Sequence, residues 1–270
     1  MKINIVDKKG KEKGNITLAG YFNEPLRQDL IKRAVLSLQS RKRQPYGSDP
    51  EAGKRHSTLI SKRRRKYRGC YGHGISRVPR KILSRRGTRM FWVGAFAPGT
   101  VGGRRAHPPK AEKIWEQNIN KKENKKAFLS ALSATLNKKL AEQRNHMLPE
   151  KYPFIITDDF EKLSKTKEII SALQSLGFEK ELERTKYRKI RAGKGKSRGR
   201  KYKKSKSLLI VVSSKDSLLK KHGKNIPGVD ITDALSLNTE DLAPGAVPGR
   251  ATLYTESSIK VLDERITGKK

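Results

Sequence analysis

The chain has 270 residues, with 63 Lys and Arg against 26 Asp and Glu, so its formal net charge is +37. A charge of this size is far beyond what solubility needs and implies a polyanionic partner. The hydrophobic fraction of 34% excludes a single well-packed globule of the whole chain, and the one cysteine excludes an internal disulfide framework.

The positive charge is concentrated in two segments. Residues 41–110 hold 20 basic and 2 acidic residues, and residues 184–206 hold 13 basic and no acidic residues. The other 177 residues have a net charge of only +6, which is typical of an ordinary domain that can bury a core. We therefore expect one globular domain formed by residues 1–40 and 111–270, a long basic extended loop at 41–110, and a basic insertion at 184–206.

A membrane surface could also attract this charge, but it would require a basic amphipathic helix or an apolar stretch of roughly 18 residues. The sequence contains neither. The first ten residues, MKINIVDKKG, lack the apolar core of a signal peptide. We therefore expect a cytoplasmic protein with no membrane partner.

The first predicted helix follows Asn23 and Pro25, with apolar residues spaced four apart from Leu26 to Leu38. Asn is a capping residue, and Pro is tolerated in the first turn. The periodicity vanishes in residues 41–110, which contain 10 Gly and 6 Pro. It resumes from Phe128 to Leu140, so the basic loop is predicted to be inserted between two helices of one domain.

The rest of the chain alternates short apolar runs with helical stretches. The runs occupy residues 154–156, 208–212, 229–231 and 251–254. A helix through residues 163–173, capped by Asp158 with Glu161 three residues on, follows the first run, and a short helix at Leu218 and Leu219 follows the second. This pattern predicts an α/β fold: a three-layer α/β/α domain with a small, mostly parallel sheet of about four strands.

The two basic segments have the composition of an RNA-binding surface. Cationic groups neutralise phosphates, and aromatic residues such as Tyr71, Phe91, Trp92 and Phe96 can stack on unpaired bases. A disordered tail is the alternative, but an interior loop that returns to the same domain makes a poor tail, although in isolation we expect it to be largely disordered. The candidate RNA-binding residues are Arg41, Lys42, Arg43, Lys54, Arg55, Lys62, Arg63, Arg64, Arg65, Lys66, Arg68, Arg77, Arg80, Lys81, Arg85, Arg86, Arg89, Arg104, Arg105, His107, Lys110, Arg188, Lys189, Arg191, Lys194, Lys196, Arg198, Arg200, Lys201 and Lys203.

Nucleotide hydrolysis and metal binding are both disfavoured. Gly195-Lys196-Ser197 resembles the end of a phosphate-binding P-loop, but Ile190 stands where the pattern requires Gly, and the motif precedes a strand rather than following one. Cys70 stands alone, and the five histidines show no paired ligand spacing. We therefore expect no metal and no cofactor.

Catalysis by other side chains is also disfavoured. A Cys70 thiolate beside His73 would need a geometry that a flexible, Gly-rich loop does not hold. The cluster Asp158, Asp159 and Glu161 invites a general acid–base role, but helix capping explains it without further assumptions. We therefore expect a protein that is not an enzyme and has no small-molecule substrate.

Two further alternatives remain open. A parallel sheet with basic appendages could belong to an RNA-modifying enzyme with a nucleotide cofactor at its strand ends. Against this, Thr157-Asp158-Asp159 and Ser213-Ser214-Lys215 follow the first two strands, where a Gly-rich turn would be needed. The other alternative is a free assembly factor or a chromatin-like packaging protein that binds by charge alone.

Six ordered motifs resemble one family across nearly the whole chain. They are RVPRK at residues 77–81, GGRRAHPPKAEK at 102–113, INKKENKKA at 119–127, RAGKGKSRGR at 191–200, NIPGVDI at 225–231 and LAPGAVPGRATLYTESSIKVLDE at 242–264. Together they are similar to the fourth protein of the large ribosomal subunit in its archaeal and eukaryotic form. The insertion and the modest chain length resemble the archaeal members.

The resemblance implies a ribonucleoprotein component of translation, cytoplasmic and ribosome-bound. It implies a structural constituent of the large ribosomal subunit that binds large-subunit rRNA and supports assembly. Its loop would extend to the constriction of the peptide exit tunnel, beside the other tunnel-constriction protein and further large-subunit proteins. By motif position the tip lies between Lys62 and Trp92, although residues 62–68 and 90–92 depart from better-known members. The tunnel-lining candidates are Tyr71, His73, Arg77, Arg80, Phe91 and Trp92.

Overall fold

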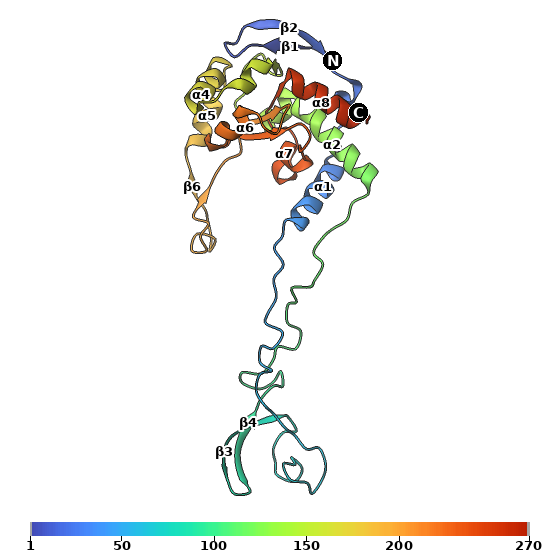
Figure 1. The fold of residues 1–270 in the computed structure, drawn as a ribbon, viewed down its shortest axis with the longest axis vertical. Helices are drawn as coiled ribbons and strands as arrows, with labels where there is room; N and C mark the ends of the chain where they lie inside the picture. The colour runs from blue at the N-terminus through green and yellow to red at the C-terminus, as the bar shows by residue number, and fades with distance from the viewer. Residues whose placement is uncertain (1, 269–270) are drawn as a thin grey trace. The chain divides into compact units, whose positions relative to one another are not determined.

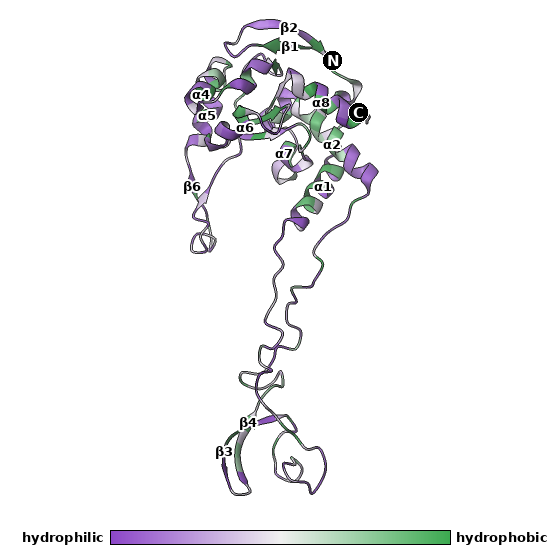
Figure 2. Ribbon diagram, in the orientation of Figure 1, coloured by the Kyte–Doolittle hydropathy of each residue, from purple (hydrophilic) through white to green (hydrophobic). Residues whose placement is uncertain are grey.

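The computed structural model describes residues 2–268. These residues form two compact units. Residues 2–41 and 116–268 make up the first, which we call the body, and residues 42–115 make up the second, which we call the loop unit. Figure 1 shows the order of the elements along the chain, and in Figure 2 the most apolar segments lie in the helices and strands of the body.

A six-stranded sheet with the order β2-β1-β5-β10-β8-β9 forms the centre of the body. Its strands are β1 (Lys2–Val6), β2 (Glu12–Thr17), β5 (Ile155–Ile156), β8 (Leu209–Val212), β9 (Asp230–Asp233) and β10 (Thr252–Thr255). Neighbouring strands are parallel in the pairs β1–β5, β5–β10, β10–β8 and β8–β9, and only β2 runs antiparallel to its neighbour, β1. The predicted mostly parallel α/β sheet is confirmed, with two more strands than expected.

Helices cover both faces of this sheet. The helices of the body are α1 (Gln28–Arg41), α2 (Lys121–Thr135), α3 (Lys138–Gln143), α4 (Thr166–Ser175), α5 (Glu179–Lys186), α6 (Leu218–His222), α7 (Thr239–Leu242) and α8 (Glu256–Thr267). Short 3-10 helices are η1 (Gly20–Asn23), η2 (Asp158–Lys162), η3 (Gly223–Asn225) and η4 (Pro244–Ala246). Apolar residues of α4 and α6 pack on one face, and apolar residues of α1, α2 and α8 pack on the other. This is the predicted three-layer arrangement.

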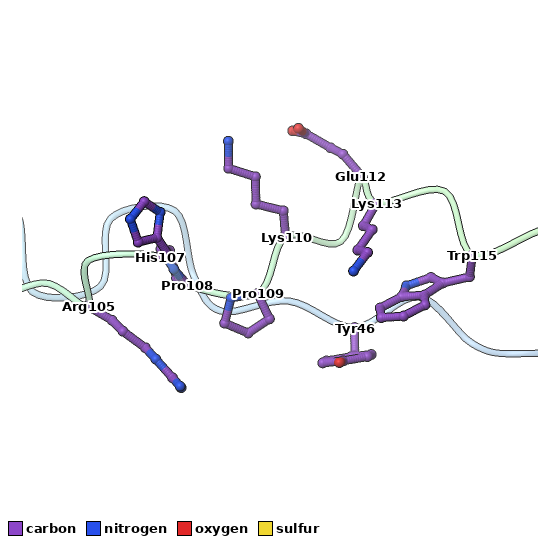
Figure 3. A pocket seen from close by; sticks show the side chains of 9 residues that line it. All are labelled: Tyr46, Arg105, His107, Pro108, Pro109, Lys110, Glu112, Lys113 and Trp115. Atoms are coloured by element: carbon purple, nitrogen blue, oxygen red, sulfur yellow. The ribbon is translucent and has the colours of Figure 1, made fainter.

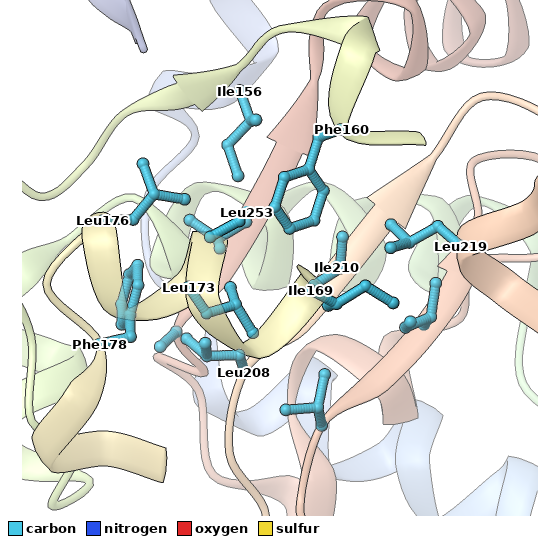
Figure 4. Packing of buried hydrophobic residues seen from close by; sticks show 14 of the residues in the cluster. Ile156, Phe160, Ile169, Leu173, Leu176, Phe178, Leu208, Ile210, Leu219 and Leu253 are labelled. Carbon is cyan, nitrogen blue, oxygen red and sulfur yellow. The ribbon is translucent and has the colours of Figure 1, made fainter. Parts of the chain in front are cut away.

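Strand β8 shows why the apolar runs predict a doubly covered sheet. Ile210 and Val212 belong to the core on the α4 side, whereas Leu209 and Val211 belong to the core on the α2 side. Side chains alternate between the two faces of a strand, so a strand that is buried on both faces has apolar residues at successive positions. Figure 4 shows Ile210 in the first core, together with Leu173 of α4.

The N-terminal hairpin was missing from the sequence-based expectation. Its first strand β1 buries Ile3 and Val6 and pairs with β5 through Ile5 and Ile155. The turn at Gly10 has φ +80°, a left-handed conformation that favours glycine. The alternation of Ile3 and Ile5 before this Gly was the sequence signal.

The start of α1 differs from the prediction. The helix begins at Gln28, and Asn23 ends η1 rather than capping α1. The Ser130 hydroxyl of α2 accepts a hydrogen bond from the Arg27 amide at 2.8 Å and donates one to the Pro25 carbonyl at 3.0 Å. The backbone groups just before this helix are therefore hydrogen-bonded by a side chain that lies 103 positions away in the sequence.

The apolar pattern from Phe128 to Leu140 spans two helices rather than one. Helix α2 ends at Thr135, and α3 begins after Asn137, whose side chain accepts from the Leu140 amide at 3.4 Å. Asn is favoured at this capping position because its side-chain oxygen accepts a hydrogen bond from a backbone amide of the first turn that has no partner within the helix.

The loop unit contains a β-hairpin that the sequence pattern did not predict. Strands β3 (Arg80–Arg86) and β4 (Arg89–Gly94) pair antiparallel around a turn at Gly87, where φ is +59°. Its side chains are largely exposed, including Leu83 and Phe91. The basic insertion likewise contains a short antiparallel pair, β6 (Lys189–Ile190) and β7 (Tyr202–Lys203).

Candidate nucleic-acid interface

The two chain segments that enter and leave the loop unit approach each other closely. The Ser48 amide donates to the Pro109 carbonyl at 3.0 Å. A Cβ on Gly47 would lie 2.5 Å from the Ala111 nitrogen, so only glycine fits this crossing. A second close approach occurs at Gly53, where φ is +74° and a Cβ would lie 2.6 Å from the Arg104 nitrogen. These two crossings pair residues 43–55 with residues 103–115, and we call the two paired segments the stem.

Arg80 organises the far part of the loop unit from inside. It is buried, and its guanidinium donates to the Ser76 carbonyl at 2.6 Å and the Val78 carbonyl at 3.2 Å. The same group lies 3.5 Å from the buried Cys70 thiol and 5.5 Å from the Trp92 ring. Since these contacts use the guanidinium locally, we leave Arg80 out of the interface proposed below.

Other arginines of the loop unit contact aromatic side chains, either at the ring face or at a tyrosine hydroxyl. The Arg77 guanidinium carbon lies 4.4 Å from the Tyr71 ring centre, and Arg85 donates to the Tyr67 hydroxyl at 2.7 Å. Guanidinium–ring contacts hold the cation in place while its edge remains available to a phosphate. The contacts therefore favour ordered cations over a freely moving charge run.

The structure places the candidate RNA-binding residues on the loop unit and the basic insertion, except for Arg41 at the end of α1. Most of these side chains are exposed. Lys54, Arg68, Lys81 and Arg104 are partly buried, and Arg80 is buried.

The tunnel-lining candidates differ in accessibility. His73, Arg77 and Phe91 are exposed, whereas Tyr71 and Trp92 are partly buried and Arg80 is buried.

A buried carboxylate anchors the basic insertion to the body. Glu181 of α5 accepts from Arg184 Nε at 2.9 Å, where the insertion begins, and from the Ser207 hydroxyl at 2.9 Å, where it ends. His146 Nδ1 lies 2.8 Å from the same carboxylate, and the Met147 amide donates to it at 2.9 Å. Burial raises the pKa of Glu181, but the hydrogen bonds from His146 and Arg184 outweigh it and lower this pKa to about 2.

A second ion pair, between a buried arginine and a partly buried aspartate, lies at the same end of the sheet. The Arg250 guanidinium is fully buried and contacts the Asp230 carboxylate at 2.5 Å and the Ser207 carbonyl at 2.9 Å. Lys206 also donates to Asp230, at 2.7 Å. Burial raises the pKa of Asp230, but the Arg250 charge and Lys206 lower it below its ordinary value. Both ends of the basic insertion are thus fixed to the body by ionic hydrogen bonds.

The acidic cluster after β5 has a structural role that differs from the predicted one. Helix α4 begins at Thr166, so neither Asp158 nor Glu161 caps it. Asp158 instead accepts from the Ser257 amide at 2.8 Å, in the first turn of α8. Glu161 accepts from the Ser213 amide at 2.8 Å and the Thr255 hydroxyl at 2.6 Å. The prediction failed because these partners lie far away in the sequence.

These hydrogen bonds occupy the carboxyl ends of the central strands. Parallel α/β enzymes bind cofactors at that edge, where strand ends leave a crevice. Here Glu161 bridges Ser213 after β8 and Thr255 of β10. The carboxylates that could have served acid–base chemistry are therefore used to join the strand ends.

Two residues of the loop unit were missed by the sequence-based reasoning. Tyr46 and Trp115 stack with ring centres 5.4 Å apart and ring planes at 20°. They come from opposite ends of the unit, and no local spacing relates them. The nearby basic motif at residues 102–113 was the only signal in the sequence.

The fold and these surfaces define a class of protein: a mostly parallel α/β body with two exposed cationic extensions suited to a polyanion. None of the helices in the described part of the chain has the length and apolar character that crossing a membrane requires.

Comparison with known proteins identifies the family. A model of the ribosomal protein L4/L1 family matches residues 16–265. Large ribosomal subunit protein uL4 of Nanoarchaeum equitans is 49% identical over 265 residues, covering 98% of each chain. The uL4 proteins of Archaeoglobus fulgidus and Sulfurisphaera tokodaii are 43% and 44% identical, and the alignments cover 98% and 99% of this chain and 99% and 96% of theirs. The chain belongs to the ribosomal protein L4/L1 family.

The family assignment confirms two predictions. The resemblance to archaeal members is confirmed, because these relatives are archaeal. The expectation that the chain is not an enzyme is confirmed as well, because the family consists of ribosomal proteins.

Proposed function

We propose that the chain is a structural constituent of the large ribosomal subunit and binds large-subunit rRNA through the loop unit and the basic insertion. It acts by positioning: cations neutralise phosphates where RNA segments converge, and ordering of the loop unit is coupled to subunit assembly. The names of the archaeal relatives support the ribosomal role.

One observation carries this proposal: the exposed cations lie on segments that lack a core and acidic partners of their own. Residues 41–110 contain 20 basic residues but only 2 acidic ones, so most of the cations have no carboxylate to pair with. None of the three hydrophobic clusters in the described residues includes a residue of the loop unit. Apolar burial therefore contributes little to ordering this unit, and phosphate contacts supply the missing stabilisation.

We further propose that the far part of the loop unit reaches the constriction of the exit tunnel, beside the other tunnel-constriction protein. The exposed candidates His73, Arg77 and Phe91 are the side chains best placed to face a neighbour or the lumen. Arg80 is assigned a supporting role, because its guanidinium holds the surrounding backbone.

Salt-dependent binding tests the RNA interface. Replacing Arg63–Arg65 by Ser removes three exposed cations from the loop unit, and replacing Lys8, Lys9 and Lys11 by Ser removes three from the N-terminal hairpin of the body. In filter binding to large-subunit rRNA, the first variant should lower the slope of log affinity against log salt by about 2 to 3, or roughly 0.7 to 0.9 for each phosphate that is no longer neutralised. The control should keep the wild-type slope. Equal slopes for both variants, or an affinity nearly independent of salt, would refute the interface.

Deleting residues 41–110 and rejoining the helices tests the coupling to assembly. Since the body's hydrophobic clusters contain no loop-unit residue, the variant should fold, with a far-UV circular dichroism spectrum typical of an α/β domain. It should incorporate poorly into large subunits. Normal incorporation would show that the loop is dispensable.

A further inference from the structure

A pocket of about 710 Å³ lies in the stem of the loop unit. We call it the stem pocket and define it by Tyr46, Arg105, His107, Lys110, Lys113 and Trp115, which line it. Figure 3 shows Tyr46 on one segment of the stem and the other lining residues on the returning segment. Its volume is within the range of about 300 to 1,000 Å³ that is typical of small-ligand sites.

The stem pocket contains an aromatic platform supported by cations. Tyr46 stacks on Trp115, and 48% of Tyr46 is exposed, so the ring offers surface to a further planar group. The Arg43 guanidinium carbon lies 3.8 Å from the Trp115 ring centre, and the Lys113 ammonium lies 4.4 Å from it. An exposed ring flanked by cations is the arrangement that binds single-stranded nucleic acid, through base stacking and phosphate contacts.

The polar groups of the stem pocket are mainly donors. Arg105 and Lys110 can only donate, and Glu112 is the one carboxylate among the lining residues. The Trp115 Nε1 atom is buried without a hydrogen-bond partner in the described part of the chain. An indole N–H can only donate, so this group has no acceptor among the described residues. The pocket therefore calls for a ligand rich in acceptors, such as a phosphate or a base carbonyl.

Backbone contacts between the two stem segments hold the walls of the stem pocket in place. The Ser48 amide donates to the Pro109 carbonyl, and Gly47 permits the close approach of Ala111. Pro108 and Pro109 have fixed φ angles, which limits the freedom of this wall. A preformed platform reduces the entropy cost of ligand binding.

We propose that the stem pocket binds one unpaired RNA nucleotide, with its base stacked on the Tyr46–Trp115 platform and its phosphates near Lys113 and Arg105. The proposal rests on the proposed function and sharpens it, because it assigns base contact to one site among many phosphate contacts. A peptide is disfavoured as the ligand, since an acidic peptide would satisfy the cations but would leave the exposed ring unused.

Fluorescence of Trp115 tests the stem pocket directly. The chain has two tryptophans, so Trp92→Phe in the full-length protein leaves Trp115 as the sole reporter. Oligoadenylate should quench Trp115 saturably, whereas an abasic oligonucleotide of the same length should bind, by anisotropy of a labelled strand, without equal quenching. Equal quenching by the abasic strand would mean that phosphate alone fills the pocket, and would overturn the stacking.

A Tyr46→Ala substitution measures the contribution of the platform. Loss of base stacking should weaken oligoadenylate binding by about 5- to 150-fold, the equivalent of roughly 1–3 kcal/mol per base. Tyr187→Ala is the matched control, since Tyr187 is an exposed aromatic residue, at 74%, that does not line the pocket. Equal losses in the two variants would overturn the assignment.

Filter binding of the same proteins to large-subunit rRNA separates this inference from the proposed function. If wild-type protein binds rRNA with a steep salt dependence while oligoadenylate leaves Trp115 unquenched, the nucleotide pocket is refuted and the rRNA-binding role stands. If wild-type protein does not bind rRNA, the proposed function fails, and the pocket proposal fails with it.

Discussion

Replacing Glu181 by Gln should destabilise the body and release the basic insertion. The carboxylate is buried and accepts hydrogen bonds from Arg184, Ser207 and the Met147 amide, with His146 Nδ1 also at 2.8 Å. A neutral amide keeps the shape but offers one acceptor oxygen in place of two and leaves the buried edge of Arg184 without its counter-charge. Breaking a buried ion pair from one side costs about 3–5 kcal/mol.

The pKa of Glu181 gives an independent magnitude with a defined sign. Folding lowers this pKa from an ordinary 4.5 to about 2, and that difference corresponds to about 3 kcal/mol. Because the folded-state pKa is depressed, the stabilisation is complete above pH 4.5 and is lost as the pH falls from 4.5 toward 2. The Glu181→Gln variant should therefore be about 3 kcal/mol less stable at neutral pH and should lack this part of the acid dependence.

Urea unfolding followed by far-UV circular dichroism measures the effect. This signal is preferable to tryptophan fluorescence, because Trp92 and Trp115 both lie in the loop unit. Glu183→Gln is the matched control, since Glu183 is exposed on the same helix, and it should change stability by less than about 0.5 kcal/mol. Equal stabilities and equal acid dependence of the two variants would refute the anchoring role of Glu181.

Three further substitutions have defined outcomes. Arg250→Met leaves the Ser207 carbonyl without its buried guanidinium donor and should lower the free energy of unfolding by about 1–3 kcal/mol in urea titrations; an unchanged free energy of unfolding would contradict the anchoring role of Arg250. Asp158→Ala removes the acceptor of the α8 amide and should cost about 1 kcal/mol, with faster hydrogen exchange in the first turn of α8; unchanged exchange would count against it. Gly47→Ala should open the stem, because its Cβ would lie 2.5 Å from a backbone nitrogen, and should speed tryptic cleavage of the rRNA complex. Gly99→Ala, with open space around it, is the control, and equal cleavage rates would show that the crossing is unimportant.

The sequence predicted the centre of the fold because burial left a strong local signal there. All four predicted apolar runs lie in the sheet as β5, β8, β9 and β10. Every residue of β5, β8 and β10 is buried, as expected for strands covered on both faces, whereas β9 lies at the edge of the sheet and alternates between buried and partly buried positions. Positions that depend on distant partners were not predictable in this way. Ser130 determines the entry to α1, and Ser257 determines the role of Asp158, and neither partner is near in sequence.

The candidate site was predictable in composition but not in geometry. Charge counts located both cationic segments, because an excess of Lys and Arg needs no structural context to be recognised. They could not show that Arg80 is buried, since its acceptors are backbone carbonyls that carry no sequence signal. The Tyr46–Trp115 stack was hidden for a related reason: it forms only where the two segments of the stem cross.

A density map of large ribosomal subunits that contain this chain is the most direct test of its proposed role. We predict that residues 42–115 are enclosed by large-subunit rRNA, that the basic insertion contacts rRNA phosphates, and that one unpaired base lies against Tyr46. Subunits without the chain after a salt wash, or a map in which both cationic segments face solvent, would contradict the proposed role.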